Sequence, residues 1–219
     1  MSAIQELTLN KGLVCDLALN EGSGTKVFDR TENENHGTIV GATWVDDDRK
    51  SGKALNFAGV SDLVTLPSIE PTSFTVEGWF KANSDKVNTI YGMPSTQSSY
   101  KDITIKVNSG GVIQAYFGRG TTLRNYVHND LFNVNDGSWH QVVTTYNEVT
   151  LKATVYVDKL SAPSSVLGSA IVYSGQPKWI GAYGLASSYS DGVIDSLRIW
   201  NRVLSPQEIR WSYERRRTQ

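Results

Sequence analysis

Apolar and polar residues alternate along much of this chain with the period of two that is typical of half-buried β-strands. Short runs rich in Val, Ile, Thr, Tyr, Phe and Trp are separated by clusters of Gly, Asn, Asp and Ser. This pattern predicts an all-β protein with many short strands. The expected strands are 13–19, 38–42, 54–57, 63–66, 74–81, 89–91, 103–107, 112–117, 123–127, 139–146, 150–157, 171–173, 178–182 and 193–200.

The number of strands and the end of the chain predict the architecture. So many strands need two stacked antiparallel sheets, because one open sheet would leave a large apolar face in water. After the last strand, Ser205 suits an N-cap, Pro206 suits the first helical position and Glu208 completes a capping box. We therefore expect a short C-terminal helix, and no long helical periodicity before it. Residues 1–219 show no linker and no internal repeat, so we expect a single domain.

The last expected strand contains one unusual polar residue. With a period of two, Val193, Asp195, Leu197 and Ile199 share one face, and only Asp195 in that row is polar. A buried carboxylate is unfavourable unless its charge is compensated. Asp195 therefore needs a cation, a basic side chain or backbone N–H donors.

The composition of the chain limits the classes of partner that we expect. The chain has 21 basic and 22 acidic residues and a net charge of -1, which favours neither nucleic acid nor an anionic membrane. We expect no membrane insertion, because no stretch is apolar and long enough to cross a bilayer. No signal peptide is visible, and localisation stays open, with an extracellular or virion role as options. The single cysteine, Cys15, lies in an apolar strand and is expected to be buried and inert.

Several segments, taken in their order along the chain, resemble those of a known protein family. They include Gly52-Lys53-Ala54-Leu55-Asn56-Phe57, Phe74-Thr75-Val76-Glu77-Gly78-Trp79-Phe80, Gly137-Ser138-Trp139-His140 and Asp195-Ser196-Leu197-Arg198-Ile199-Trp200. From about Leu13 to Tyr213 the chain closely resembles the laminin G-like members of the concanavalin A-like lectin/glucanase superfamily. The resemblance implies a jelly roll of one concave and one convex antiparallel sheet.

The resemblance also implies a structural calcium ion. In the family pattern the Asp of the last strand is a ligand, and a loop near the start of the chain supplies further oxygens. Calcium prefers carboxylate, amide and carbonyl oxygens. The expected metal ligands are Asp29, Asn33, Asn35 and Asp195. The loop departs from the pattern, because Thr31-Glu32 stands where Ser-Gly is common and Glu34 replaces a Gly; the alternative is that Asp29 and Asn35 cap turns.

The residues that glycoside hydrolases of this superfamily use are missing. Catalysis there needs two carboxylates that flank the scissile bond, supplied by a Glu-x-Asp-x-x-Glu strand motif. Glu77 has no second carboxylate at i+2 or i+4. The three histidines are scattered, and no zinc-hydrolase motif occurs. We therefore expect no enzymatic activity.

Binding is the remaining class of function, and sugar sites combine aromatic faces with a few fixed polar groups. Residues on central strands are expected to line a concave groove, and aromatic residues of loops to form its rim. The expected ligand-binding residues are Glu77, Trp79, Tyr91, Tyr116, Tyr183 and Tyr189.

The sequence therefore supports two main hypotheses. The first is a lectin-like domain, stabilised by calcium, that binds a carbohydrate or glycoconjugate without catalysis. The second is a structural or adhesion module, such as a virion or surface-assembly component, that binds protein partners. A polysaccharide hydrolase or lyase is a third alternative. The fold does not distinguish these classes, because this superfold hosts all of them.

Overall fold

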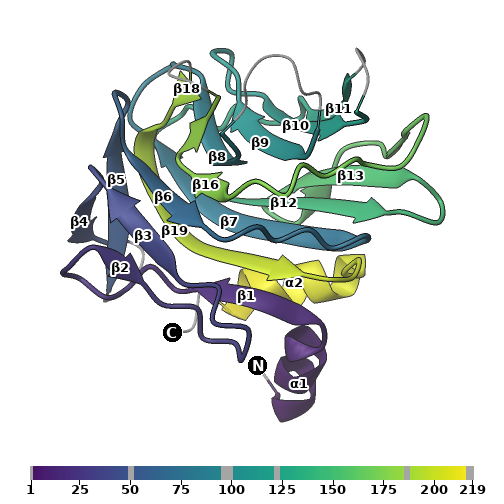
Figure 1. The fold of residues 1–219 in the computed structure, drawn as a ribbon, viewed down its shortest axis with the longest axis horizontal. Coiled ribbons are helices and arrows are strands. Elements are labelled where there is room, and N and C mark those ends of the chain that lie inside the picture. The colour runs from purple at the N-terminus through teal and green to yellow at the C-terminus, as the bar shows by residue number, and fades with distance from the viewer. Residues whose placement is uncertain (1, 49–51, 95–100, 121–123, 185–187, 216–219) are drawn as a thin grey trace.

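Two antiparallel sheets stack face to face, and two helices lie on the outer side of one of them (Figure 1). The computed structural model describes residues 2–48, 52–94, 101–120, 124–184 and 188–215 of the 219. None of the helices in these ranges is long and apolar enough to cross a bilayer. The all-β sandwich with a short C-terminal helix is therefore confirmed.

Sheet A carries the helices, and sheet B forms the opposite face of the sandwich. In spatial order, sheet A contains β14 (Leu160–Ser161), β13 (Lys152–Val157), β12 (Trp139–Asn147), β7 (Phe74–Ala82), β19 (Asp191–Trp200), β5 (Lys53–Ala58) and β4 (Thr43–Asp46), with β1 (Leu13–Leu17) paired to β19 and β15 (Ser165–Val166) paired to β13. Sheet B contains β11 (Arg124–Asn129), β10 (Ile113–Gly118), β9 (Ile103–Val107), β8 (Asn88–Gly92), β16 (Lys178–Ile180), β6 (Leu63–Leu66), β3 (Gly37–Val40) and β2 (Lys26–Val27). A separate hairpin joins β17 (Ala182–Tyr183) to β18 (Ser188–Tyr189).

The main core lies between the two sheets. Alternate residues of β7 and β12 point into it and meet residues of sheet B, as the ring contacts of Phe74 (β7) and Tyr146 (β12) with Phe117 (β10) show. Full burial of one such side chain stabilises the fold by roughly 1.5–3 kcal/mol. Cys15 is part of this core with no exposed surface, as the sequence predicts, and burial raises the pKa of its thiol.

The two helices pack on the outer face of sheet A, where a second, smaller apolar cluster lies. It contains Leu9 of α1 (Ala3–Asn10), Ile209 of α2 (Pro206–Arg215) and Trp200 of β19. The predicted capping box of α2 is present: the Glu208 N–H donates to the Ser205 hydroxyl, and the Ser205 N–H donates to the Glu208 carboxylate.

Helix α1 was not expected from the periodicity. It is short and buries only Leu9, so its amphipathic pattern is weak. The sequence feature that could have predicted α1 is its N-cap, because Ser2 and Gln5 form a capping box.

Two strand predictions need correction, and five short strands were missed. Residues 171–173 form no strand; the backbone of Val172 instead bonds to the backbones of Asp102 and Gly118 at the ends of other strands. The expected strand 178–182 is divided into β16 and β17. Of the missed strands, β2, β14, β15 and β18 have two residues each, too few to show a period, and the four residues of β4 do not alternate in burial.

A β-bulge in β19 overturns the predicted alternation of its side chains. Asp195 pairs with Trp79 and Arg198 pairs with Glu77, so two residues of β19 oppose one residue of β7. Ser196 takes a left-handed conformation (φ 52°) at this point. Asp195 therefore shares the outer face with Arg198 and does not lie in the inward row of Leu197.

Candidate functional site

The Asp29 carboxylate is the centre of the loop in which the sequence places calcium. It is 6% exposed and accepts hydrogen bonds from the N–H groups of Asp16 (2.8 Å), Thr31 (3.0 Å) and Asn35 (2.9 Å). The Thr31 hydroxyl donates a fourth bond, at 2.8 Å. A carboxylate offers about four acceptor sites, so protein donors occupy those of Asp29.

The two asparagines of the same loop point toward one backbone carbonyl. Asn33 and Asn35 each donate from the side-chain amide nitrogen to the Val14 carbonyl oxygen, at 3.2 and 2.8 Å. A calcium ion beside this carbonyl requires both amides to be reversed, so that oxygen replaces nitrogen. The donor set therefore fits a hydrogen-bonded loop, and it fits calcium only after that rearrangement.

The fourth predicted ligand, Asp195, lies across a strand from this loop. Leu17 of β1 pairs with Leu197 on one edge and with Asp29 on the other. Two strand spacings separate the Leu197 and Asp29 backbones by roughly 10 Å. Asp195 has no exposed surface and accepts a bond from the Ser196 hydroxyl at 3.1 Å. In the part of the chain that the structure describes, no group of three or more His, Cys, Asp or Glu is arranged to hold a metal.

Helix α2 covers the surface that the sequence assigns to a ligand groove. Glu77 is 0% exposed and accepts a hydrogen bond from the Ser212 hydroxyl of α2 at 2.6 Å. Trp79 is 5% exposed and stacks on Tyr213 of α2, with ring centroids 5.5 Å apart. Neither side chain reaches a ligand unless α2 is displaced. Tyr91, 2% exposed, belongs to the core between the sheets.

Beneath α2, the buried guanidinium of Arg198 joins two carboxylates. Its Nε donates to Asp16 at 2.9 Å, and its Nη1 lies 3.6 Å from Glu77. Burial lowers the pKa of Arg198, but attraction to Glu77 and Asp16 outweighs burial and raises it. Both carboxylates therefore face a permanent cation in a region that α2 shields from solvent. This geometry differs from that of a glycosidase pair, which must flank a substrate bond.

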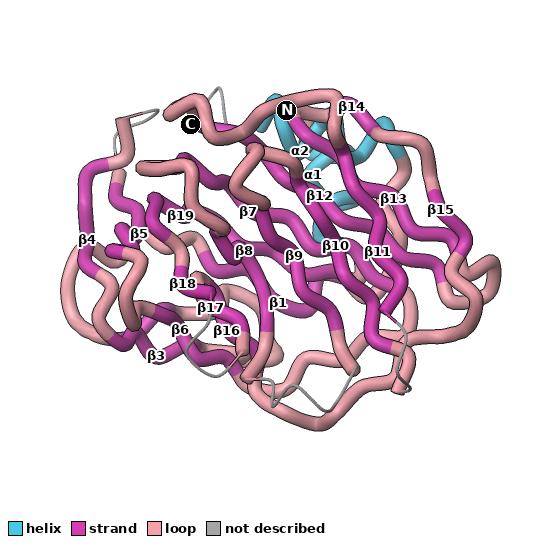
Figure 2. The backbone as a smooth tube through the Cα atoms, turned by 90° about the horizontal axis from the view of Figure 1, so that it is seen from above, coloured by secondary structure: helices cyan, strands magenta, loops and turns pink. Residues whose placement is uncertain are grey.

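The outer face of sheet B instead presents aromatic rings to solvent. We call Lys106 of β9, Tyr116 of β10, and Tyr126 and His128 of β11 the aromatic platform; β9, β10 and β11 lie side by side in Figure 2. The Lys106 ammonium lies 4.6 Å from the centroid of the Tyr116 ring. The Tyr116 and Tyr126 centroids are 5.9 Å apart, as are those of Tyr126 and His128. Tyr126 is 56% exposed.

The hairpin of β17 and β18 forms a wall beside this platform. It packs against Gly92 of β8, where a Cβ would lie only 2.7 Å from the Ala182 carbonyl oxygen, so the close approach requires glycine. Tyr183 of this hairpin lines a small depression together with Tyr116 and Lys106. Two predicted ligand residues, Tyr116 and Tyr183, are thus brought together.

Of the other residues near the aromatic platform, one was predicted from the sequence as a ligand-binding residue and two were not. Tyr189 is half-buried on β18, directly opposite Ala182. Lys106 and His128 were missed as candidates. The period of two places each on an outer face, but only the register shows that they flank the same residue, Gln114, on the two sides of β10.

Known proteins resemble this chain in sequence and in fold. A laminin G family model, described as concanavalin A-like lectin/glucanases superfamily, matches residues 58–210. The protein named "Sushi, von Willebrand factor type A, EGF and pentraxin domain-containing protein 1" is 28% identical over 178 residues in both Rattus norvegicus and Mus musculus. The match covers 74% of this chain and only 5% of each relative.

The solved binding domains of several toxins share the fold of this chain. The binding domain of botulinum neurotoxin DC, solved in complex with rat synaptotagmin II, matches with a TM-score of 0.75 and 12% identity, over 94% of this chain and 52% of that one. The binding domain of Paraclostridial Mosquitocidal Protein 1 matches with a TM-score of 0.74 and 15% identity, over 94% and 52% of the two chains. The ligand-binding domain of botulinum neurotoxin serotype D, solved with N-acetylneuraminic acid, matches with a TM-score of 0.73 and 13% identity, over 96% and 52%.

Proposed function

Because this chain belongs to the concanavalin A-like lectin/glucanases superfamily, we propose that it is a non-catalytic domain that binds a carbohydrate or glycoconjugate through the aromatic platform. The observation that carries the proposal is the row of aromatic rings on the outer face of sheet B, with Tyr126 as its most exposed ring. Sugar rings present C–H faces that pack on aromatic rings, while neighbouring polar groups bond the hydroxyls.

The polar groups around the platform suit this role. Lys106 is a hydrogen-bond donor, His128 offers two ring nitrogens, and the Tyr116 hydroxyl donates to the Gln114 amide oxygen at 3.0 Å. Two fold neighbours were solved with a protein and with a sugar bound, so binding as a class of function agrees with the comparisons.

A glycan array tests the proposal. We expect the wild-type protein to bind a subset of glycans, and the Tyr116→Ala, Tyr126→Ala double variant to lose that signal while its far-UV circular dichroism and melting temperature stay near those of the wild type. A clean negative across the array, with self-association in light scattering, would favour the structural or adhesion module instead.

Absence of catalysis is part of the proposal and has its own assay. The support is the burial of Glu77 under α2 and its contact with Arg198. Incubation with a polysaccharide panel should release no reducing sugar and no unsaturated product. Release that survives Glu77→Gln would show a catalytic site elsewhere in the chain.

We retain the structural calcium ion as a further proposal, at the Val14 carbonyl and the loop of Asp29, Asn33 and Asn35. It rests on the clustering of oxygen-bearing side chains there, with the two amides reversed. An ion that binds the folded state preferentially raises the melting temperature. Excess EDTA should then lower the melting temperature of the wild type and leave that of Asn35→Ala unchanged. An equal melting temperature with calcium and with EDTA, together with no calcium by elemental analysis, would contradict this proposal and leave Asp29 as a hydrogen-bonded turn residue.

A further inference from the structure

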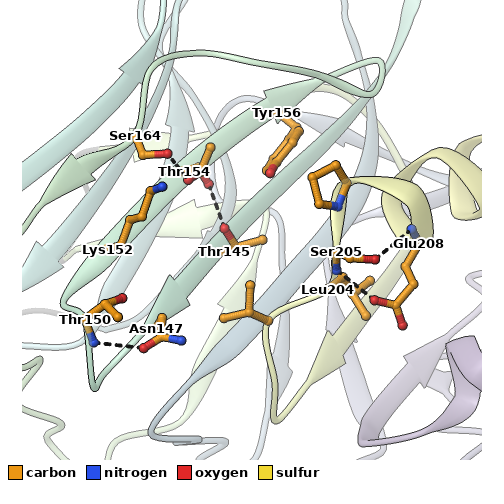
Figure 3. A pocket seen from close by; sticks show the side chains of 12 residues that line it. Thr145, Asn147, Thr150, Lys152, Thr154, Tyr156, Ser164, Leu204, Ser205 and Glu208 are labelled. Carbon is orange, nitrogen blue, oxygen red and sulfur yellow. Dashed lines mark hydrogen bonds between the residues drawn. The ribbon is translucent and has the colours of Figure 1, made fainter.

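A groove on the outer face of sheet A, opposite the aromatic platform, has the chemistry of a second binding site. Its floor is the outward row of β12 and β13, where Thr145 pairs with Thr154. One wall is the segment from Val203 to Pro206 that leads into α2 (Figure 3). The groove has a volume of about 380 Å³. This value lies within the range of small-molecule sites, roughly 300–1,000 Å³.

The wall of this groove is fixed in place. The Thr75 hydroxyl of β7 donates to the Arg202 carbonyl and accepts from the Leu204 N–H, both at 2.9 Å. The capping box of Ser205 and Glu208 holds the next turn. The groove is therefore preformed, which reduces the entropy lost when a ligand binds.

Tyr156 of β13 brings its hydroxyl to the lining of the groove. The residue is only 8% exposed, and its hydroxyl makes no hydrogen bond with any residue that the structure describes. Figure 3 shows this hydroxyl facing the space between Thr145 and Ser205. Burial raises the pKa of Tyr156, so the group stays a neutral donor and acceptor. Since no described residue bonds this hydroxyl, both its proton and its lone pairs are available to a ligand hydroxyl in the groove.

The rest of the lining adds hydroxyls and one cation. Thr154 and Ser164 share a hydrogen bond at 2.8 Å across the floor. Lys152, exposed at the end of the row, has no ion pair among the described residues. The one carboxylate of the lining, Glu208, is paired with Arg202 at 2.7 Å. The net electrostatic character of the groove is therefore cationic at the Lys152 end and hydroxyl-rich along the floor.

We infer that this groove binds an acidic monosaccharide unit, such as a uronic acid, with its carboxylate at Lys152 and its hydroxyls at Tyr156, Thr154 and Ser205. The ring hydroxyls of such a unit complement the row of side-chain hydroxyls, and its carboxylate complements Lys152, the cation of the lining. The site lies on the other face of the sandwich from the aromatic platform, and its occupancy does not depend on glycan binding there.

Titration of the ¹⁵N-labelled protein with glucuronic acid tests the inference by NMR. We expect amide shifts at Thr154, Ser164 and Ser205. Lys152→Met should raise the dissociation constant about tenfold, and Tyr156→Phe about fivefold. Because the Tyr156 hydroxyl has no protein partner, Tyr156→Phe should leave the melting temperature unchanged.

Matched variants separate this site from general effects. Tyr173→Phe removes a hydroxyl that bonds the Pro71 carbonyl at 2.7 Å, so it should lower the melting temperature and leave glucuronate binding intact. Lys26→Met removes an exposed lysine on β2 and should leave binding unchanged. Tyr126→Ala should also leave it unchanged, so failure of the platform and failure of the groove are distinguishable.

Three outcomes would overturn the inference. Equal affinity of the protein for glucuronate and acetate would show an anion site without sugar recognition. Wild-type affinity for glucuronate in both Lys152→Met and Tyr156→Phe would show that neither side chain binds it. Amide shifts confined to β9–β11 would place glucuronate on the other face of the sandwich.

Discussion

At the scale of single residues, Ser196 decides which side chains of β19 reach the core. Its left-handed backbone inserts one extra residue opposite β7, so Asp195 and Arg198 face the helices while Leu197 faces the other sheet. The Ser196 hydroxyl also donates to the Ala18 carbonyl, at 3.3 Å, and ties β1 to this point. One backbone angle therefore places the polar pair of β19 on the outer face.

The backbone at Ser196 gives the first prediction. Ser196→Val should reduce the free energy of unfolding by about 1–3 kcal/mol, because a β-branched residue is strongly disfavoured at positive φ. Ser196→Gly should reduce it by less, since glycine accepts the conformation and loses only the hydroxyl bond. Urea unfolding of both variants measures the difference. Equal losses would show that the bulge is not under strain.

His140 gives a prediction about pH. Burial lowers its pKa, but hydrogen bonds to Asp158 (2.7 Å) and Asp136 (3.1 Å) outweigh burial and raise it above 6.5. Its contribution to stability is therefore complete below the unfolded pKa and is lost as pH rises through the folded pKa. The wild type should exceed His140→Gln in melting temperature by more at about pH 5.5 than at about pH 9. An equal difference in melting temperature at both pH values would contradict this prediction.

At the scale of elements, α2 explains why the ligand groove that the sequence predicts at Glu77 and Trp79 is closed. It brings Ser212 to Glu77 and Tyr213 to Trp79, and Arg198 neutralises the carboxylate beneath it. The sequence predicted α2 itself, because a capping box is a local signal. Tertiary contacts decide on which face of sheet A α2 packs, and the sequence around Glu77 does not indicate that face.

The buried ion pair under α2 gives the element-scale prediction. Arg198→Met leaves Asp16 and Glu77 buried without a cation, and should destabilise the fold by about 3–5 kcal/mol. Arg210→Met, on the exposed side of the same helix, should change stability by less than about 0.5 kcal/mol. Chemical unfolding gives both values. Similar values for the two variants would show that the pair does not anchor α2.

The predictability of the elements follows from the same physics. Strands of at least four residues with clear alternation, such as 63–66 and 103–107, were predicted with the boundaries that the structure has. Two-residue strands exist only because a partner strand pairs with them. Likewise, the sequence identified Tyr116 and Tyr183 as candidates, but their proximity depends on the hairpin that packs on Gly92.

At the scale of the whole molecule, the sandwich offers two distinct surfaces. The outer face of sheet B presents aromatic rings, and the outer face of sheet A presents a hydroxyl-rich groove beside α2. Because the core of the sandwich separates them, each surface is open to a ligand while the other is occupied. If both proposals hold, one domain can therefore contact two glycan units at the same time.

The most direct test of the central claim is calorimetric titration of a glycan selected on the array into wild-type protein, Tyr126→Ala and Phe28→Ala. Phe28 is a matched control, because it is an aromatic residue 49% exposed on another part of the surface. If the aromatic platform binds the sugar, Tyr126→Ala weakens the affinity about tenfold, and Phe28→Ala retains wild-type affinity. Equal affinity in all three proteins would contradict the account and place the glycan away from β10 and β11.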